Sequence, residues 1–212
     1  MTFKMRTLAL PTALAAALVL ASCSTSTESG SHGSPGRTGS MIDAPAPAGP
    51  PATGARNAAD VAFATGMIPH HAQAVEMADM ALTQATDAKV KALAPTIKAA
   101  QGPEIARMSG WLRGWDAPIP ATAGGHDMSG MSDRSGMMSA QEMTDLGKAS
   151  GSTFDRMWLQ LMIRHHQGAV AMAKTELAEG TNPESSQLAQ SIIDSQSGEI
   201  AQMTSILAGV TG

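Results

Sequence analysis

Tyrosine is missing from this chain of 212 residues, and only one cysteine, three tryptophans and three phenylalanines are present. A single cysteine excludes an intrachain disulfide and a metal site built from several thiolates. The formal net charge is −4 and no basic patch occurs, which argues against a nucleic-acid partner. No G-x-S-x-G motif or Ser–His–acid pattern appears, so the sequence gives no support for a hydrolase.

The first 23 residues have the pattern of a lipoprotein signal peptide. Lys4 and Arg6 precede an apolar run, Leu8 to Leu20, that is too short to span a bilayer comfortably. The run closes with the letters LASC, which resemble a bacterial lipobox whose cysteine carries the lipid. We therefore expect Cys23 to be lipidated and the protein to lie outside the cytoplasm, attached to the cell membrane only through that lipid. The alternative is an ordinary secretory signal with an incidental cysteine.

Residues 24–56 are rich in serine, glycine, proline and alanine and contain few large apolar side chains. Such a segment cannot bury enough surface to offset the entropy lost on ordering, so we interpret it as a flexible tether. Residues 57–210 remain, and they are numerous enough for one domain with a hydrophobic core.

Two stretches of this domain are near-copies with the same spacing throughout. MIPHHAQAVEMA begins at Met67 and MIRHHQGAVAMA begins at Met162, and the match continues at the same offset to Met108 and Met203. Alanine, leucine, methionine, glutamine and glutamate dominate, and apolar residues recur every three or four positions, which predicts helices. We predict an all-α domain in which two duplicated hairpins, 57–113 and 152–207, form an antiparallel four-helix bundle.

Polar residues mark the expected start of the first helix in each hairpin. Asn57 with Asp60 predicts a capped helix start, and Ser152 with Asp155 predicts the same in the second copy. We therefore interpret the two aspartates as capping residues rather than as metal ligands.

The adjacent histidines in each copy are the strongest candidates for chemistry. At 100° per residue they lie on the core-facing side of their helix, and folding each hairpin brings a glutamate and a glutamine to the same level. Only one imidazole of each pair is expected to point fully inward. Buried polar groups must be paired or bind something, and imidazole, thioether and carboxylate groups are metal ligands. The predicted metal ligands are His70, His71, His165, His166, Met67, Met162, Glu104 and Glu199, supported by Gln101 and Gln196. The alternative is a metal-free His–Glu network that fixes the packing of the hairpins.

Residues 117–150 have no counterpart in the repeat and contain GGHDMSGMSDRSGMMS. A flexible exposed segment gains nothing by packing methionines. Thioether and imidazole groups suit Cu(I), and imidazole with carboxylate suits Cu(II). The spacing resembles the tails of bacterial copper-handling proteins. We predict further copper ligands at His126, Met128, Met131, Met137 and Met138, the alternative being a methionine-rich linker without a ligand.

The doubled M-I-x-H-H motif followed by A-V-x-M-A resembles the bacterial domain-of-unknown-function 305 family. The match covers roughly Asn57 to Leu207. This resemblance implies a ferritin-like four-helix fold in an exported protein and, for some members, periplasmic copper binding. The positions that match the motif are His70, His71, His165, His166, Met67, Met77, Met162 and Met172.

Together these features predict a non-enzymatic copper-binding lipoprotein that buffers the ion or exchanges it with an unidentified donor or acceptor protein. One alternative is a ferritin-like di-metal oxidase. It is disfavoured because no Glu-x-x-His occurs with the paired histidines, and only Glu104 and Glu199 supply carboxylates. The other alternative is a metal-free interaction module whose His–Glu core is purely structural.

Overall fold

Helices make up most of the described chain, which in this computed structural model comprises residues 54–122 and 136–210. The helices are α1 (Ala58–Gln84), α2 (Ala88–Gly114), α4 (Ala140–Lys148), α5 (Gly151–Glu179) and α6 (Pro183–Gly209). No strand occurs within those residues, so the predicted all-α class is confirmed. The expected signal peptide, the lipidated Cys23 and most of the tether lie outside the described residues.

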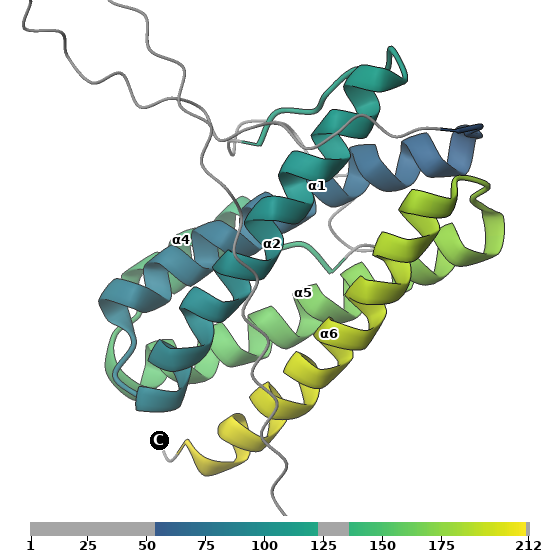
Figure 1. Ribbon diagram of the computed structural model, residues 1–212. Helices are drawn as coiled ribbons and strands as arrows, with labels where there is room; N and C mark the ends of the chain where they lie inside the picture. Colours follow the sequence, from purple (N-terminus) through teal and green to yellow (C-terminus); the bar gives the residue numbers. More distant parts are fainter. Residues whose placement is uncertain (1–53, 123–135, 211–212) are drawn as a thin grey trace, which may run out of the picture. The chain divides into compact units, whose positions relative to one another are not determined.

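Helices α1 and α2 form one hairpin and α5 and α6 form the other, as the repeat predicts. The hairpins meet mainly along α1 and α5, whereas α2 and α6 touch each other only lightly. Figure 1 shows the two hairpins side by side, one blue to teal and one green to yellow. None of the helices in the described ranges has the length and hydrophobicity needed to cross a membrane. The predicted helical bundle is confirmed, with α4 as a helix that the sequence analysis did not predict.

The helix starts follow from local sequence. Asn57 and Asp60 form a reciprocal capping box at the start of α1, as predicted. The Asp87 side chain accepts hydrogen bonds from two backbone N–H groups in the first turn of α2. Asn182 does the same for α6, where Pro183 occupies the first helical position and needs no hydrogen-bond partner for its nitrogen.

Asp155 does not cap its own helix, contrary to the sequence-based prediction. Helix α5 begins after Ser150, whose side chain makes no capping hydrogen bond. The buried Asp155 carboxylate instead accepts hydrogen bonds from the backbone nitrogens of Thr86, at 3.0 Å, and Asp87, at 2.9 Å. These nitrogens belong to the turn between α1 and α2. Asp155 therefore holds the turn of the opposite hairpin.

Asp60 makes the corresponding contact in the other direction. In addition to its capping box, it accepts hydrogen bonds from the backbone nitrogens of Thr181, at 3.1 Å, and Asn182, at 2.9 Å, in the turn between α5 and α6. Each hairpin thus contributes one aspartate that binds the turn of the other. Because α1 begins where α5 ends, the two helices run antiparallel, and these paired contacts fix their register.

Two hydrophobic clusters fill the interior on either side of a polar layer. One cluster includes Ile97, Trp158 and Met162, and the other includes Phe63 and Trp111. On each of the four long helices, the paired histidines, or the glutamine and glutamate that recur in both copies, lie between members of the two clusters. The fold therefore concentrates polar groups at one level in the middle of the bundle. We call this level the histidine layer, and its members are His70, His71, Gln101, Glu104, His165, His166, Gln196 and Glu199.

A second carboxylate lies beside Asp60 at the end of the bundle. The Ser185 hydroxyl is 2.5 Å from Oε1 of the buried Glu176 and 2.9 Å from Oδ1 of Asp60. Burial raises the pKa of Glu176 to about 7; the Ser185 hydrogen bond opposes the rise and the Asp60 carboxylate adds to it. A hydroxyl has only one proton to donate. A protonated Glu176 can therefore donate to Ser185 Oγ while Ser185 donates to Asp60.

Ionisation of Glu176 is expected to make the stability of the protein depend on pH near neutrality. Its folded pKa of about 7 exceeds the ordinary value of 4.5. The stabilising contribution is therefore complete below pH 4.5 and is lost as the pH rises through 7, a loss of about 1–3 kcal/mol in the free energy of unfolding. Melting temperatures measured between about pH 5 and pH 8 should fall less steeply for Glu176→Gln than for the unmodified chain.

The exposed Glu179, three positions further along α5, supplies the matched control. In Glu179→Gln the melting temperature should fall with pH as steeply as in the unmodified chain, because no carboxylate is removed from the buried cluster. Equal slopes for Glu176→Gln and the unmodified chain would contradict this assignment.

Candidate metal centre

All four paired imidazoles are fully buried, with relative exposures of 0%. The expectation that only one ring of each pair points inward is wrong. Consecutive residues on a helix differ in direction by 100°, so one ring can face the partner helix of its own hairpin while the other faces the opposite hairpin. Both directions are interior here, because α1 and α5 each have helices packed on two sides.

His71 and His166 face glutamates of their own hairpins. His71 Nε2 lies 2.7 Å from Glu104 Oε2, and His166 Nε2 lies 2.7 Å from Glu199 Oε2. The glutamate side chains keep relative exposures of 18% and 15%, so they reach the surface while the rings do not. A carboxylate that accepts a hydrogen bond from a ring nitrogen fixes the orientation of the ring and makes its other nitrogen a better ligand.

His70 and His165 face each other across the junction of the two hairpins. Their ring centroids are 3.7 Å apart with an angle of 37° between the planes. The neighbouring centroid distances are 6.4 Å from His70 to His71 and 6.3 Å from His165 to His166. The four imidazoles therefore form a row through the core, and a partly exposed glutamate stands at each end.

Burial and the three neighbouring imidazoles hold the pKa of His165 well below its usual range. The neutral ring has a lone pair available, and neutral imidazole is the form that binds metals. Neither nitrogen of the His165 ring makes a hydrogen bond of normal length and angle, and the Nδ1 atoms of His71 and His166 also make none. The backbone of His70 lies close enough to oppose the lowering of the His165 pKa. Buried polar atoms without partners are costly, so a ligand that accepts these lone pairs would stabilise the layer.

The buried glutamine side chains also have polar atoms without a hydrogen-bond partner. Neither the oxygen nor the nitrogen of the Gln101 side chain has a hydrogen-bond partner, and the Gln196 oxygen also lacks one. Met67 and Met162 are fully buried in the two hydrophobic clusters that border the layer. No three His, Cys, Asp or Glu side chains in the described part of the chain are already gathered around one point. The side chains of the histidine layer thus lie close together, but they must reorient before they can enclose a metal ion.

The predicted exposure of the inter-hairpin methionines is wrong for Met137 and Met138. Both side chains are buried, and Met138 belongs to the cluster around Trp158. The reason is helix α4, whose capping box joins Ser139 and Glu142 and stops the segment from remaining a simple linker. The serine followed three positions later by a glutamate is the sequence signal that could have revealed this helix. The remaining predicted ligands in this segment, His126, Met128 and Met131, lie outside the described residues.

Sequence reasoning also missed two residues that hold this segment. Gln73 on α1 makes two hydrogen bonds with the backbone of Met138. Arg164 on α5 forms an ion pair with Glu142 and donates to the sulfur of Met138. Their counterparts in the repeat are Gly168 and Pro69 (95 positions away in each case), so the repeat itself gave no hint of either contact.

Residues 60–207 match the sequence profile of the family described as a domain of unknown function, DUF305. The chain belongs to the DUF305 family. Two solved DUF305 structures are similar to it. One is a protein from Streptomyces coelicolor described as secreted, with 36% identity and a TM-score of 0.63, covering 71% of this chain and 93% of that one. The other is a fragment from Deinococcus radiodurans, with 34% identity and a TM-score of 0.65, covering 75% of this chain and 99% of that one.

The chain is also similar to CopM, a protein solved with metal ions bound. The Cu(II)-bound form has 38% identity to this chain and a TM-score of 0.61, covering 71% of this chain and 96% of CopM. CopM has also been solved in Cu(I)-bound, Ag-bound and apo forms. No curated protein sequence matches the chain.

Proposed function

We propose that this DUF305 protein binds copper outside the cytoplasm and buffers it or passes it to another protein. The observation that carries the proposal is the row of four buried imidazoles, several of whose nitrogens have no hydrogen-bond partner. The likeness to CopM, which was solved with Cu(I) and Cu(II), supports the choice of metal. A lipid on Cys23 would keep the domain at the membrane surface.

The chemistry of the layer favours Cu(I) over harder ions. Neutral imidazole and thioether groups bind Cu(I) well, and the core supplies both, at the histidine pairs and at Met67 and Met162. Within this proposal, Glu104 and Glu199 orient the rings of His71 and His166 rather than binding the ion directly. His126, Met128 and Met131 remain predicted ligands for the ion on its way to the core.

The di-metal oxidase is the weaker alternative. Such a site needs a glutamate from each of two helices and a Glu-x-x-His from each of the other two. Only Glu104 and Glu199 stand beside the histidines among the described residues, and each is paired with an imidazole. The charge of the layer is therefore too small to stabilise two highly charged iron ions.

A titration of the full-length apoprotein with Cu(I), in competition with a chelator, tests this function. We expect the protein to take Cu(I) from a chelator of about micromolar affinity, which corresponds to about −8 kcal/mol of binding free energy. An affinity no better than about millimolar, near −4 kcal/mol, would end the proposal. Elemental analysis of untagged protein from iron-rich medium separates the oxidase: stoichiometric iron with oxygen-dependent absorbance would favour it.

A further inference from the structure

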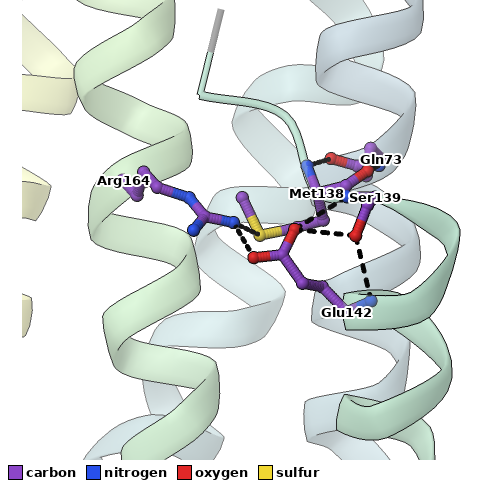
Figure 2. A network of polar contacts seen from close by, with 5 residues as sticks. All are labelled: Gln73, Met138, Ser139, Glu142 and Arg164. Carbon is purple, nitrogen blue, oxygen red and sulfur yellow. Dashed lines mark hydrogen bonds and ion pairs between the residues drawn. The ribbon is translucent and has the colours of Figure 1, made fainter. Parts of the chain in front are cut away.

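Residues Gly136–Glu142, which we call the latch, lie across the junction of α1 and α5. Figure 2 shows the latch between the two helices, with Gln73 reaching it from α1 and Arg164 from α5. The latch follows the other predicted loop ligands in the sequence and includes the first three residues of helix α4. It is the described segment that joins the predicted loop ligands to the bundle.

The hydrogen bonds between the latch and α1 come from one amide side chain. Gln73 Nε2 donates to the carbonyl oxygen of Met138 at 2.9 Å, and the backbone nitrogen of Met138 donates to Gln73 Oε1 at 2.7 Å. The side chain thus satisfies both backbone groups of one latch residue. Because both bonds depend on a single side chain, one substitution can remove them.

The contact with α5 combines charge and close backbone packing. Arg164 pairs with Glu142 and donates to Met138 Sδ at 3.2 Å. Gly136 has a φ of +72°, and a Cβ placed on it would meet the carbonyl oxygen of Arg164 and lie 3.3 Å from Cα of Gly168. Only glycine permits this conformation and this approach together.

The latch lies at the level of the two facing imidazoles. Gln73 follows His70 by three positions, so the two residues are neighbours on the surface of α1. On α5, Arg164 and Gly168 stand immediately before and three positions after His165. The contacts that hold the latch therefore bracket the point where the His70 and His165 rings meet.

We propose that the latch gates the passage of copper between solvent and the facing imidazoles of His70 and His165. This inference rests on the proposed copper binding. Burial of the Met137 and Met138 side chains helps to hold the latch, and the polar contacts add to it. The Arg164–Glu142 pair is partly exposed, so that pair contributes only modestly. A Cu(I) ion that binds the Met138 sulfur would compete with Arg164 for it. Arrival of the ion at the latch would therefore favour its release.

The repeat explains why the latch meets different residues on α1 and α5. The position equivalent to Arg164 in the first copy is Pro69, which has no charge to offer. The position equivalent to Gln73 in the second copy is Gly168, whose missing side chain leaves room for Gly136. The two copies have thus diverged, and α1 and α5 now make different contacts with the latch.

The test compares the double variant Gln73→Ala/Glu142→Gln with the unmodified chain. We expect hydrogen exchange to accelerate in residues 136–148, and Cu(I) uptake from a chelator and its release to accelerate by about tenfold. The equilibrium affinity should change by less than about threefold, because no proposed ligand is removed. Gly136→Ala should also accelerate hydrogen exchange of the latch and exchange of Cu(I), and it changes no residue of α1 or α5. The matched control is Gln190→Ala, which removes an exposed glutamine from α6.

The outcomes separate the latch from the proposed function. If the unmodified chain binds no Cu(I), the copper function fails and the gating proposal fails with it. Suppose instead that the unmodified chain binds Cu(I), and that the latch residues of the variants have lost their protection from hydrogen exchange. If these variants then take up and release Cu(I) as slowly as the unmodified chain, only the gating proposal is overturned. A large loss of affinity in the double variant, without faster exchange of the ion, would also overturn it.

Discussion

His165→Leu is expected to lower the affinity for Cu(I) by about 100-fold while leaving the protein as stable as before or more stable. Removing a ligand should cost at least as much as removing a residue that only orients one, which lowers metal affinity by about 10- to 100-fold. Stability should not fall because both nitrogens of the His165 ring are buried and neither makes a hydrogen bond of normal length and angle. Replacing such a group by an apolar one of similar volume is neutral or stabilising. Cu(I) competition titration and thermal melting measure the two effects on one sample.

The neighbouring His166→Leu is the matched comparison. It removes the ring that pairs with Glu199 at 2.7 Å, and so leaves without its partner a carboxylate whose side chain is only 15% exposed. This variant should lose stability as well as affinity, because an unpaired buried charge is costly. If His165→Leu destabilised the protein as much as His166→Leu and left Cu(I) binding intact, the layer would be a structural network without a role in metal binding.

Asp155→Ala is expected to lower the free energy of unfolding by about 3 kcal/mol. The carboxylate accepts hydrogen bonds from the backbone nitrogens of Thr86 and Asp87 and from the Thr86 hydroxyl. Its removal leaves these donors without a charged acceptor at the junction of the hairpins. For a domain of this size the loss corresponds to a melting temperature lower by about 6–12 °C.

Asp194→Ala provides the control, because Asp194 is an exposed aspartate that accepts a hydrogen bond from the nearby Gln190 on its own helix. It should change the free energy of unfolding by no more than about 0.5 kcal/mol. Asp60→Ala should be at least as harmful as Asp155→Ala, because Asp60 also belongs to the α1 capping box. If Asp155→Ala were as mild as Asp194→Ala, the register of the hairpins would not depend on these contacts.

The fold and the level of the histidines could be predicted because they follow from short-range rules. A repeat with one constant offset specifies two similar hairpins, and helical periodicity places His71 and Glu104 on facing surfaces of neighbouring helices. The caps at Asn57, Asp87 and Asn182 are likewise local, because each side chain bonds to a backbone group two or three positions away. Such features need no knowledge of how the hairpins pack.

Helix α4 was missed although its capping box is a local signal, but the other missed features depend on contacts between distant parts of the chain. Asp155 has the sequence context of a helix cap, but it bonds to a turn that lies 69 positions away along the chain. The burial of both rings in each pair depends on α1 packing against α5, which supplies an interior environment for the second ring. Met138 is buried because Gln73 and Arg164 hold it from two different helices. Sequence spacing does not reveal such partners, because neither residue of a pair belongs to a motif that indicates the contact.

X-ray absorption at the copper edge, measured on full-length protein loaded with one equivalent of Cu(I), tests the histidine layer most directly. We predict the multiple-scattering pattern of imidazole ligands, and its clear reduction in His165→Leu. A spectrum that shows only thioether sulfur around the ion, unchanged by that substitution, would contradict the account and assign the copper to methionines alone.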